Sequence, residues 1–118
     1  MWAQVSHIFL ATLTRAFGLT RIPGVGAGDY IEDLKARADQ GHAIAQSTLG
    51  YMYKIGQGVP QDYVQAHKWY NLAASKLTGR LRASATKLRD RVATKMTPAQ
   101  IKEAQRLARE WQPVKGAP

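Results

Sequence analysis

The sequence contains no cysteine among its 118 residues. That absence excludes disulfide bridges and thiolate metal ligands, but it leaves the compartment open because many exported proteins also lack cysteine. The three histidines, His7, His42 and His67, lie far apart and share no spacing typical of a metal site. We expect each to be a surface histidine or a hydrogen-bonded one. The sequence therefore predicts no metal and no cofactor.

A recognisable catalytic group is missing as well. The carboxylates form no pair whose spacing indicates a general acid and a general base, and no nucleophile stands in a characteristic setting. The glycine-rich segment 24–29 invites comparison with phosphate-binding loops. It follows no strand pattern, however, and it lacks the Lys-Ser or Lys-Thr pair of a Walker loop. We therefore expect a protein without enzymatic activity, in which this segment is a turn between helices.

Acidic residues are few: 8 Asp and Glu stand against 17 Lys and Arg, and the formal net charge is +9. The imbalance belongs to the second half, because residues 1–59 carry 5 basic and 4 acidic side chains while residues 60–118 carry 12 and 4. Such asymmetry is typical of proteins that bind nucleic acid, an anionic membrane or an acidic protein. It concerns association and does not bear on the fold.

A long apolar run is also absent, and we expect a soluble protein without a membrane span. The N-terminal run Ile8–Leu13 is short, and Arg15 follows it, whereas a secretory signal places its basic residues first. Residues 1–20 therefore predict either a packing helix or a degenerate export signal, with 25–27 as a small-residue cleavage site. The helix would present one apolar stripe: Trp2, Val5, Phe9, Leu13 and Ala16.

Strand-like alternation is absent too, and apolar residues repeat instead at spacings of three and four. Glycines and prolines divide this pattern into six predicted helices. They are 1–20, 29–40, 42–54, a helix opening at Asp62, a helix with the stripe Leu77, Leu81, Ala85, Leu88 and Val92, and a helix from Thr97 to Trp111. Short connections between them favour antiparallel hairpins, so the predicted fold class is all-α with stacked helical hairpins.

Local signals mark three points of these helices. Asp62 with Gln65, and Thr97 with Gln100, have the spacing of capping boxes, in which two orphan amide groups are satisfied reciprocally. Gly50 lies in the middle of a predicted helix, where glycine is unfavourable. We therefore expect another helix to approach closely at Gly50.

Residues between positions 38 and 74 share the spacing of a known helical repeat. They are Ala38, Gly41, Ala45, Leu49, Gly50, Tyr53, Gly56, Gly58, Val59, Asp62, Ala66, Trp69, Tyr70, Ala73 and Ala74. On these positions the segment resembles the Sel-one-like repeat (SLR) family, a relative of the tetratricopeptide repeat. The resemblance implies a short right-handed α-solenoid and a scaffold role in protein–protein interaction, and family members are often exported to the periplasm. Residues 88–113 are similar to the tail that follows the last repeat in many bacterial members.

A lone repeat cannot bury both of its faces, so neighbouring elements must cover it. Moving the motif forward by one repeat length brings Ala85, Thr86 and Arg89 to the places of Leu49, Gly50 and Tyr53, so no second clean repeat follows. We expect these parts in chain order: 1–20, N-terminal helix or export signal; 29–75, repeat region with its clean unit at 38–74; 76–112, C-terminal capping helical hairpin; 113–118, tail. Two alternatives stay open, an eroded repeat upstream and a piece of a longer repeat protein.

A candidate partner-binding stripe lies on the first helix of the repeat. Opposite its core-facing Ala45 and Leu49, this helix carries a second stripe: Ile44, Ser47, Tyr51 and Lys54. An apolar pair rimmed by polar groups fits a binding site for a protein or peptide. Burial of the stripe against the helix at 29–40 is an equally good interpretation.

A candidate anion-binding set edges the apolar stripe of the fifth predicted helix: Arg80, Lys87, Arg91 and Lys95. The helix has no interleaved aromatics for base stacking, and a solvated basic face flanking a packed helix explains the pattern too. Our main hypothesis is a bacterial, non-catalytic adaptor for a protein partner, with only weak and nonspecific nucleic-acid binding. The alternative is a basic helical module that binds nucleic acid or another polyanion.

Overall fold

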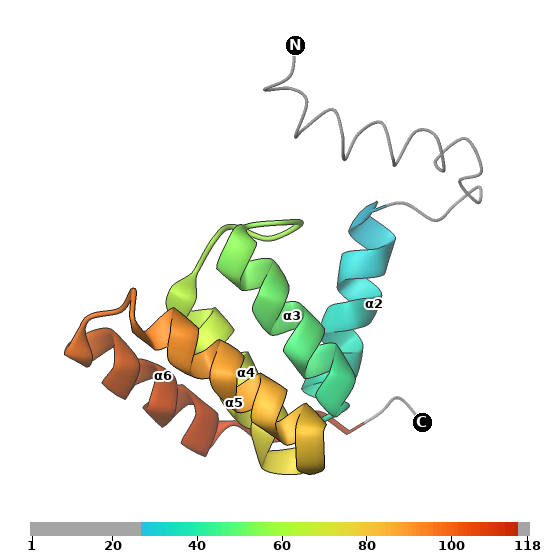
Figure 1. Cartoon of the computed structure of the whole chain (residues 1–118). Coiled ribbons are helices and arrows are strands. Elements are labelled where there is room, and N and C mark those ends of the chain that lie inside the picture. Colours follow the sequence, from blue (N-terminus) through green and yellow to red (C-terminus); the bar gives the residue numbers. More distant parts are fainter. Residues whose placement is uncertain (1–26, 116–118) are drawn as a thin grey trace. The chain divides into compact units, whose positions relative to one another are not determined.

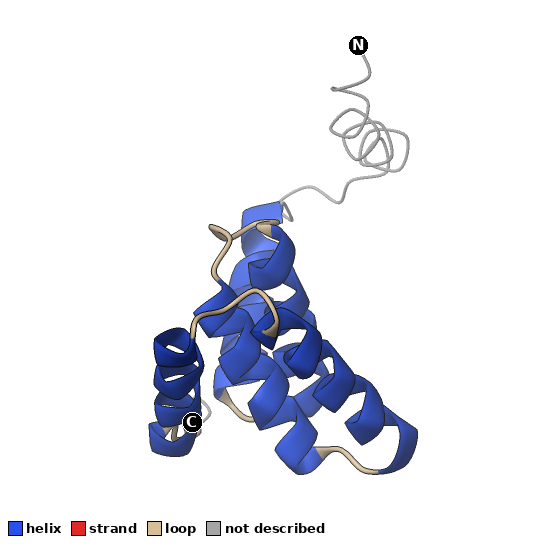
Figure 2. Cartoon of the chain, turned by 60° about the vertical axis from the view of Figure 1, so that its left-hand side comes forward, coloured by secondary structure: helices blue, strands red, loops and turns tan. Residues whose placement is uncertain are grey.

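A computed structural model describes residues 27–115, and within that range it contains helices, turns and loops but no strand (Figures 1 and 2). This confirms the all-α fold class. The chain divides into two compact units, Met1–Tyr30 and Ile31–Pro118, and the packing described below belongs to the second. The helix predicted within 1–20 lies outside the described residues. The helices are α2 (Ala27–Asp39), α3 (Ala43–Ile55), α4 (Tyr63–Lys76), α5 (Gly79–Ala93) and α6 (Pro98–Glu110).

Helices α4 and α6 begin at the predicted capping residues, Asp62 and Thr97. Thr97 and Gln100 form the full reciprocal box at the start of α6, with hydrogen bonds of 3.1 and 2.9 Å. At α4 only half of the predicted box forms. The Gln65 amide donates to Oδ1 of Asp62 at 3.1 Å, but the Asp62 amide donates to the carbonyl of Tyr53 at 2.9 Å. The loop back to α3 therefore takes the place of the returning Gln65 side chain.

Helices α3 and α4 pack as the central hairpin, and Gly50 makes their contact possible. A Cβ at Gly50 would lie 3.0 Å from two ring carbons of Tyr70 and 3.3 Å from the carbonyl oxygen of Ala66. Tyr70 and Ala66 are fully buried, so neither has free space to move into. The expected close approach at Gly50 is confirmed.

Helix α4 is the hub of the second unit, because α3, α5 and α6 all pack on it. Leu49 of α3 and Trp69 of α4 share a core cluster with Ile31, Leu34 and Ala38 of α2. Helix α5 contributes Ala85 and Val92 to the buried set, and α6 contributes Ala104. The arrangement is a short helical solenoid built around the repeat.

One predicted core position of α5 is exposed. Leu81 belongs to the predicted apolar stripe, yet 56% of its surface is accessible. At that end of α5, Ala85 packs with Ala73 and Ala74, and Leu77 is packed against them, so the contact with α4 is already filled.

After α6 the chain returns to the repeat. The rings of Trp111 and Trp69 meet edge to face, with centroids 6.4 Å apart and an interplanar angle of 75°. Nζ of Lys76 lies 4.9 Å from the Trp111 ring centroid, and the amide of Val114 donates to the carbonyl of Asp39 at 2.7 Å. The residues that follow α6 thus connect α4 with the end of α2.

Candidate functional site

The predicted partner-binding residues form what we call the α3 stripe: Ile44, Ser47, Tyr51 and Lys54. Ile44 is 59% exposed and Tyr51 is 47% exposed, while Ser47 and Lys54 are half-buried. Burial of this stripe against the helix at 29–40, the alternative interpretation, is wrong. Helix α2 packs on the other side of α3, where Nε2 of Gln46 donates to the carbonyl of Ala38 at 3.1 Å.

Lys54 connects the α3 stripe to a hollow between α3, α4 and the end of α5. Its Nζ lies 5.7 Å from the centroid of the Tyr51 ring. The same side chain lines a cavity of about 250 Å³, which we call the α3–α5 pocket; the residues around it are Lys54, Tyr63, Arg91, Val92, Thr94 and Lys95. Nζ of Lys95 lies 5.9 Å from the Tyr63 ring centroid. One residue of the predicted partner-binding set therefore meets two of the predicted anion-binding set.

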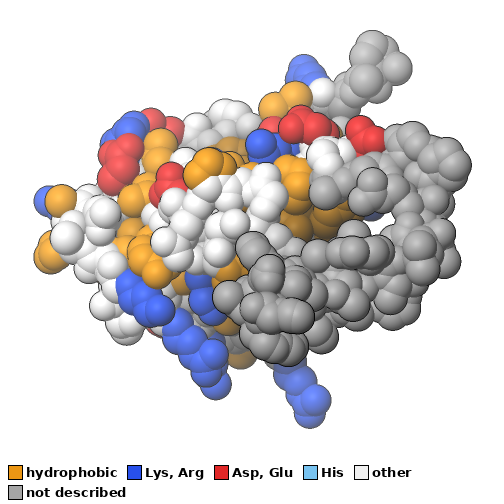
Figure 3. All heavy atoms as spheres, turned by 90° about the horizontal axis from the view of Figure 1, so that it is seen from above, with side chains coloured by type: hydrophobic (Ala, Val, Ile, Leu, Met, Phe, Trp, Pro, Cys, Tyr) orange, Lys and Arg blue, Asp and Glu red, His pale blue; other side chains and the backbone are white. Residues whose placement is uncertain are grey.

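The four predicted anion-binding residues are all exposed, but they line two different hollows. Arg91 and Lys95 line the α3–α5 pocket, whereas Arg80 and Lys87 border a separate hollow of about 270 Å³ with Ala83 and Ser84. Seen from above, basic side chains project alone along one edge, and acidic side chains with some basic ones gather along the other (Figure 3).

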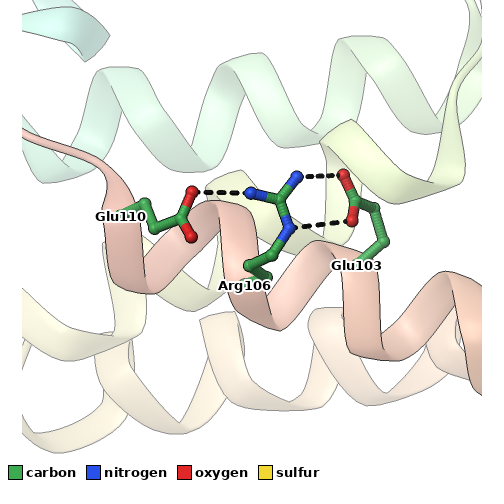
Figure 4. A network of polar contacts seen from close by, with 3 residues as sticks. All are labelled: Glu103, Arg106 and Glu110. Atoms are coloured by element: carbon green, nitrogen blue, oxygen red, sulfur yellow. Dashed lines mark hydrogen bonds and ion pairs between the residues drawn. The ribbon is translucent and has the colours of Figure 1, made fainter.

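The carboxylates of the second half of the chain have partners of their own, and none of them lines the α3–α5 pocket. Arg106 pairs with Glu103 and Glu110, each at 2.6 Å, along the exposed face of α6 (Figure 4). The hydrogen bond from Arg106 lowers the pKa of Glu103. Asp90 pairs with Arg89 at 3.0 Å, and Asp62 caps α4.

Within the part of the chain that the structure describes, the cations of the pocket have no acidic partner. Among residues 27–115, no ion pair involves Lys54, Arg91 or Lys95, and no carboxylate lines the cavity. The hydroxyl of Thr94 donates to the carbonyl of Arg91 at 2.7 Å, so its proton is already used. The pocket is a positively charged hollow with an apolar wall formed by Tyr63 and Val92.

The histidines differ from the expectation in one case. His42 is exposed, and His7 lies outside the described residues, but His67 is buried and its Nδ1 has no hydrogen-bond partner in the part that the structure describes. Burial lowers the pKa of His67, and the nearby Arg89 lowers it further. His67 therefore packs as a neutral core side chain, because α4 turns this position toward neighbouring helices.

Neither a metal cluster nor a membrane-spanning segment is found in the described part of the chain. Residues 27–115 hold no group of three or more His, Asp or Glu side chains placed to bind one ion. None of the five described helices combines the length and the apolar character that crossing a bilayer requires.

Two residues of the pocket, Tyr63 and Thr94, could not be predicted as site residues from the sequence. Tyr63 reads as part of the α4 packing stripe, and Thr94 lies at the end of α5 with no signal of its own. Only the fold brings these residues beside Lys54, because α3 and α5 both pack on α4.

Comparisons with known proteins agree with this architecture. The family model of the Sel1 repeat matches residues 43–76, which begin with α3 and end with α4. The chain is 39% identical over 61 residues to the secretory immunoglobulin A-binding protein EsiB of Escherichia coli O6:H1. That match covers 52% of this chain and 12% of EsiB. No solved structure matches significantly.

The segment matched by the family model coincides with the hairpin of α3 and α4. Sel1 repeats are typically protein–protein interaction modules, and they are generally non-catalytic. The helices before and after the hairpin cover it as neighbouring elements of a helical array do. Residues 43–76 of the chain therefore match the Sel1 repeat, the helical hairpin that defines the Sel-one-like family.

Proposed function

We propose that this chain is a non-catalytic adaptor that binds a protein or peptide partner through the α3 stripe. The observation that carries the proposal is the exposure of Ile44 and Tyr51 on one face of the repeat's first helix. Core packing does not need these side chains, since α3 buries Ala45, Leu49 and Met52 instead. An exposed apolar pair rimmed by polar groups is typical of a protein-binding surface.

The relative supports a protein as the partner. EsiB is described by its name as binding a protein, secretory immunoglobulin A. Because the match spans only 12% of EsiB, the identity of its partner does not transfer to this chain. What supports the proposal is the general mode, in which a helical repeat offers a side-chain surface to another polypeptide.

Photo-crosslinking tests this surface. A benzoylphenylalanine introduced at position 51 should capture a protein partner in the cells that produce the chain. The matched control is the same residue at position 81, because Leu81 is an exposed apolar residue on α5. Adducts of the same protein in equal yield from both positions would contradict a partner site on the α3 stripe.

Substitution then measures the contribution of the stripe. Replacing Ile44 and Tyr51 with alanine should weaken the affinity for the captured partner by about tenfold or more, since each truncated apolar anchor costs about 1–2 kcal/mol of binding free energy. Leu81→Ala should leave the affinity unchanged. Circular dichroism of each variant verifies that the fold survives.

A polyanion is the second candidate partner, favoured by four exposed cations on or beside α5. Arg80, Lys87, Arg91 and Lys95 form no ion pair within residues 27–115. For nucleic acid we expect weak binding without sequence preference, of about micromolar or poorer affinity near physiological salt. Glutamine at all four positions should abolish this weak binding, while the protein partner should still bind through Ile44 and Tyr51, without any contact that Arg91 and Lys95 add. Loss of the protein partner in that variant, with retention in the Ile44/Tyr51 variant, would favour the polyanion function.

A further inference from the structure

We infer that the α3–α5 pocket binds an acidic side chain of the partner, so that the recognised segment carries a Glu or Asp beside its apolar residue. The inference rests on the proposed function, because it assigns a second contact to the polypeptide held on the α3 stripe. Lys54 belongs to both surfaces, as part of the stripe and of the pocket wall.

Charge is the first argument. Lys54, Arg91 and Lys95 border one cavity of about 250 Å³, and none of the described residues that line it is a carboxylate. The acidic side chains of the second half of the chain form ion pairs with Arg89 and Arg106 or cap the start of α4. Three like charges around one hollow repel one another, and a carboxylate in that hollow replaces the repulsion by attraction.

The walls of the pocket are the second argument. Val92 is buried in the cluster that includes Tyr70, and the half-buried Tyr63 packs against this cluster. An apolar wall excludes water from one side of the hollow, so a charge-assisted hydrogen bond formed there is screened less than one on an open surface. The Thr94 hydroxyl donates to the carbonyl of Arg91, so the side-chain donors left for an anion are the three cations and the Tyr63 hydroxyl, whose oxygen accepts from Gln61.

The apolar part of the α3 stripe favours a peptide over nucleic acid. A phosphate backbone could follow the basic residues from Lys95 and Arg91 to the second hollow at Lys87 and Arg80, but it would use their charge alone. Nucleic acid would also leave Ile44, the most exposed residue of the stripe, without an apolar contact. A peptide with alternating acidic and apolar residues complements the pocket and the stripe together.

The test uses two variants of equal charge. R91Q/K95Q removes one Arg and one Lys from the pocket, and R80Q/K87Q removes one Arg and one Lys from the other hollow. The ligands are fluorescein-labelled peptides of alternating Glu and Leu residues in both registers, each with a counterpart that has Gln in place of Glu. Fluorescence anisotropy gives the affinities of the full chain and its variants.

The unchanged chain should bind the Glu peptides about tenfold more tightly than the Gln peptides, the scale of one charge-assisted hydrogen bond. R91Q/K95Q should lose that preference, whereas R80Q/K87Q should keep it within about twofold, as expected for exposed charges outside the contact. Equal losses in both variants would reduce the effect to overall charge and overturn the inference. Absence of any preference for Glu would overturn it as well.

Nuclear magnetic resonance locates the contact. Adding the Glu peptide to isotopically labelled protein should shift the amide signals of Tyr63, Thr94 and Lys95 more than those of Ser84 and Lys87. A single-stranded oligonucleotide should bind more weakly than the Glu peptide and displace it poorly. If the oligonucleotide bound more tightly and shifted the pocket signals, the inference would be overturned and the pocket would be a site for a polyanion. These results are independent of crosslinking at position 51. The inference about the pocket can therefore be overturned while the proposal about the α3 stripe holds, and the reverse.

Discussion

Gly50 determines at the scale of a single residue how closely α3 and α4 can pack. The Tyr70 ring fills the space that a side chain at position 50 would need, and the Ala66 carbonyl lies behind it. Sequence reasoning anticipated this contact because a glycine in a helix interior needs a compensating reason. It did not anticipate buried His67, since its position relative to the neighbouring helices is set by packing and leaves no mark in the local spacing.

We expect Gly50→Ala to destabilise the protein by about 1–2 kcal/mol, because overpacking costs about 1–3 kcal/mol and outweighs the gain of up to about 1 kcal/mol in helix propensity. Urea denaturation measures the change. Gly28→Ala is the matched control within a helix: a Cβ at this position would meet no heavy atom of the described residues within 4 Å, so the substitution should be neutral or stabilising. A stabilising Gly50→Ala would mean that Tyr70 can move aside.

His67 should make stability depend on pH in the mildly acidic range. Burial, reinforced by Arg89 and partly opposed by Asp90, lowers the folded pKa below the ordinary 6.5. The unfolded chain then binds a proton that the folded chain does not, so this contribution is fully present above 6.5 and is lost as the pH falls below it.

Urea melts at a series of pH values measure the His67 effect. His67→Gln removes the titrating group and should flatten the pH dependence between about 5 and 7. An equally steep dependence in the variant would assign the loss of stability to other groups.

At the scale of the element, sequence patterns define the helices well and their mutual contacts less well. The predicted helix at 42–54 is observed at Ala43–Ile55, and Thr97 starts α6 as its capping box indicates. The α3 stripe could be predicted because its residues share one helix and one periodicity. The α3–α5 pocket could not, because Lys54, Tyr63 and Arg91 lie on three helices whose approach is set by packing on α4.

Trp69→Ala should be among the most damaging substitutions in α4. The indole is 4% exposed, shares the core cluster of Leu49 and Leu72, and carries Nζ of Lys68 at 4.1 Å from its centroid. Loss of a buried aromatic side chain costs about 3–5 kcal/mol. Leu81→Ala, which truncates an exposed residue, should change the free energy of unfolding by less than about 0.5 kcal/mol. Equal effects in denaturant melts would refute the packing described for α4.

At the scale of the whole molecule, the Sel1 repeat matched at residues 43–76 depends on the elements around it. Helix α2 covers one side of the hairpin through Ile31, Leu34 and Ala38, and α6 with Trp111 covers part of α4. A repeat array is stable because each unit buries the face of the next. We propose that residues 76–112 serve as the cap, even though α5 and α6 pack more extensively on α4 than on each other.

Removal of residues 97–118 should therefore make the remainder aggregate or lose its cooperative melt, because Ala104, Trp111 and the Val114 contact are lost together. Size-exclusion chromatography and thermal melting measure the outcome. Full-length Arg106→Gln is the control, since it breaks only the exposed ion pairs of α6 and should melt like the unchanged chain. A monomeric truncation with a sharp transition would refute the cap.

The edge-to-face pair of Trp69 and Trp111 also gives the protein an intrinsic spectroscopic probe of whether its C-terminal segment stays attached. Indoles whose centroids are 6.4 Å apart couple electronically, and the coupling disappears when they separate. Because Trp69 belongs to α4 and Trp111 follows α6, the near-ultraviolet dichroism of this pair responds to detachment of the last helix, while the far-ultraviolet signal follows the helices as a whole. The two signals recorded side by side time the release of the C-terminal segment against the melting of the repeat, without any added label.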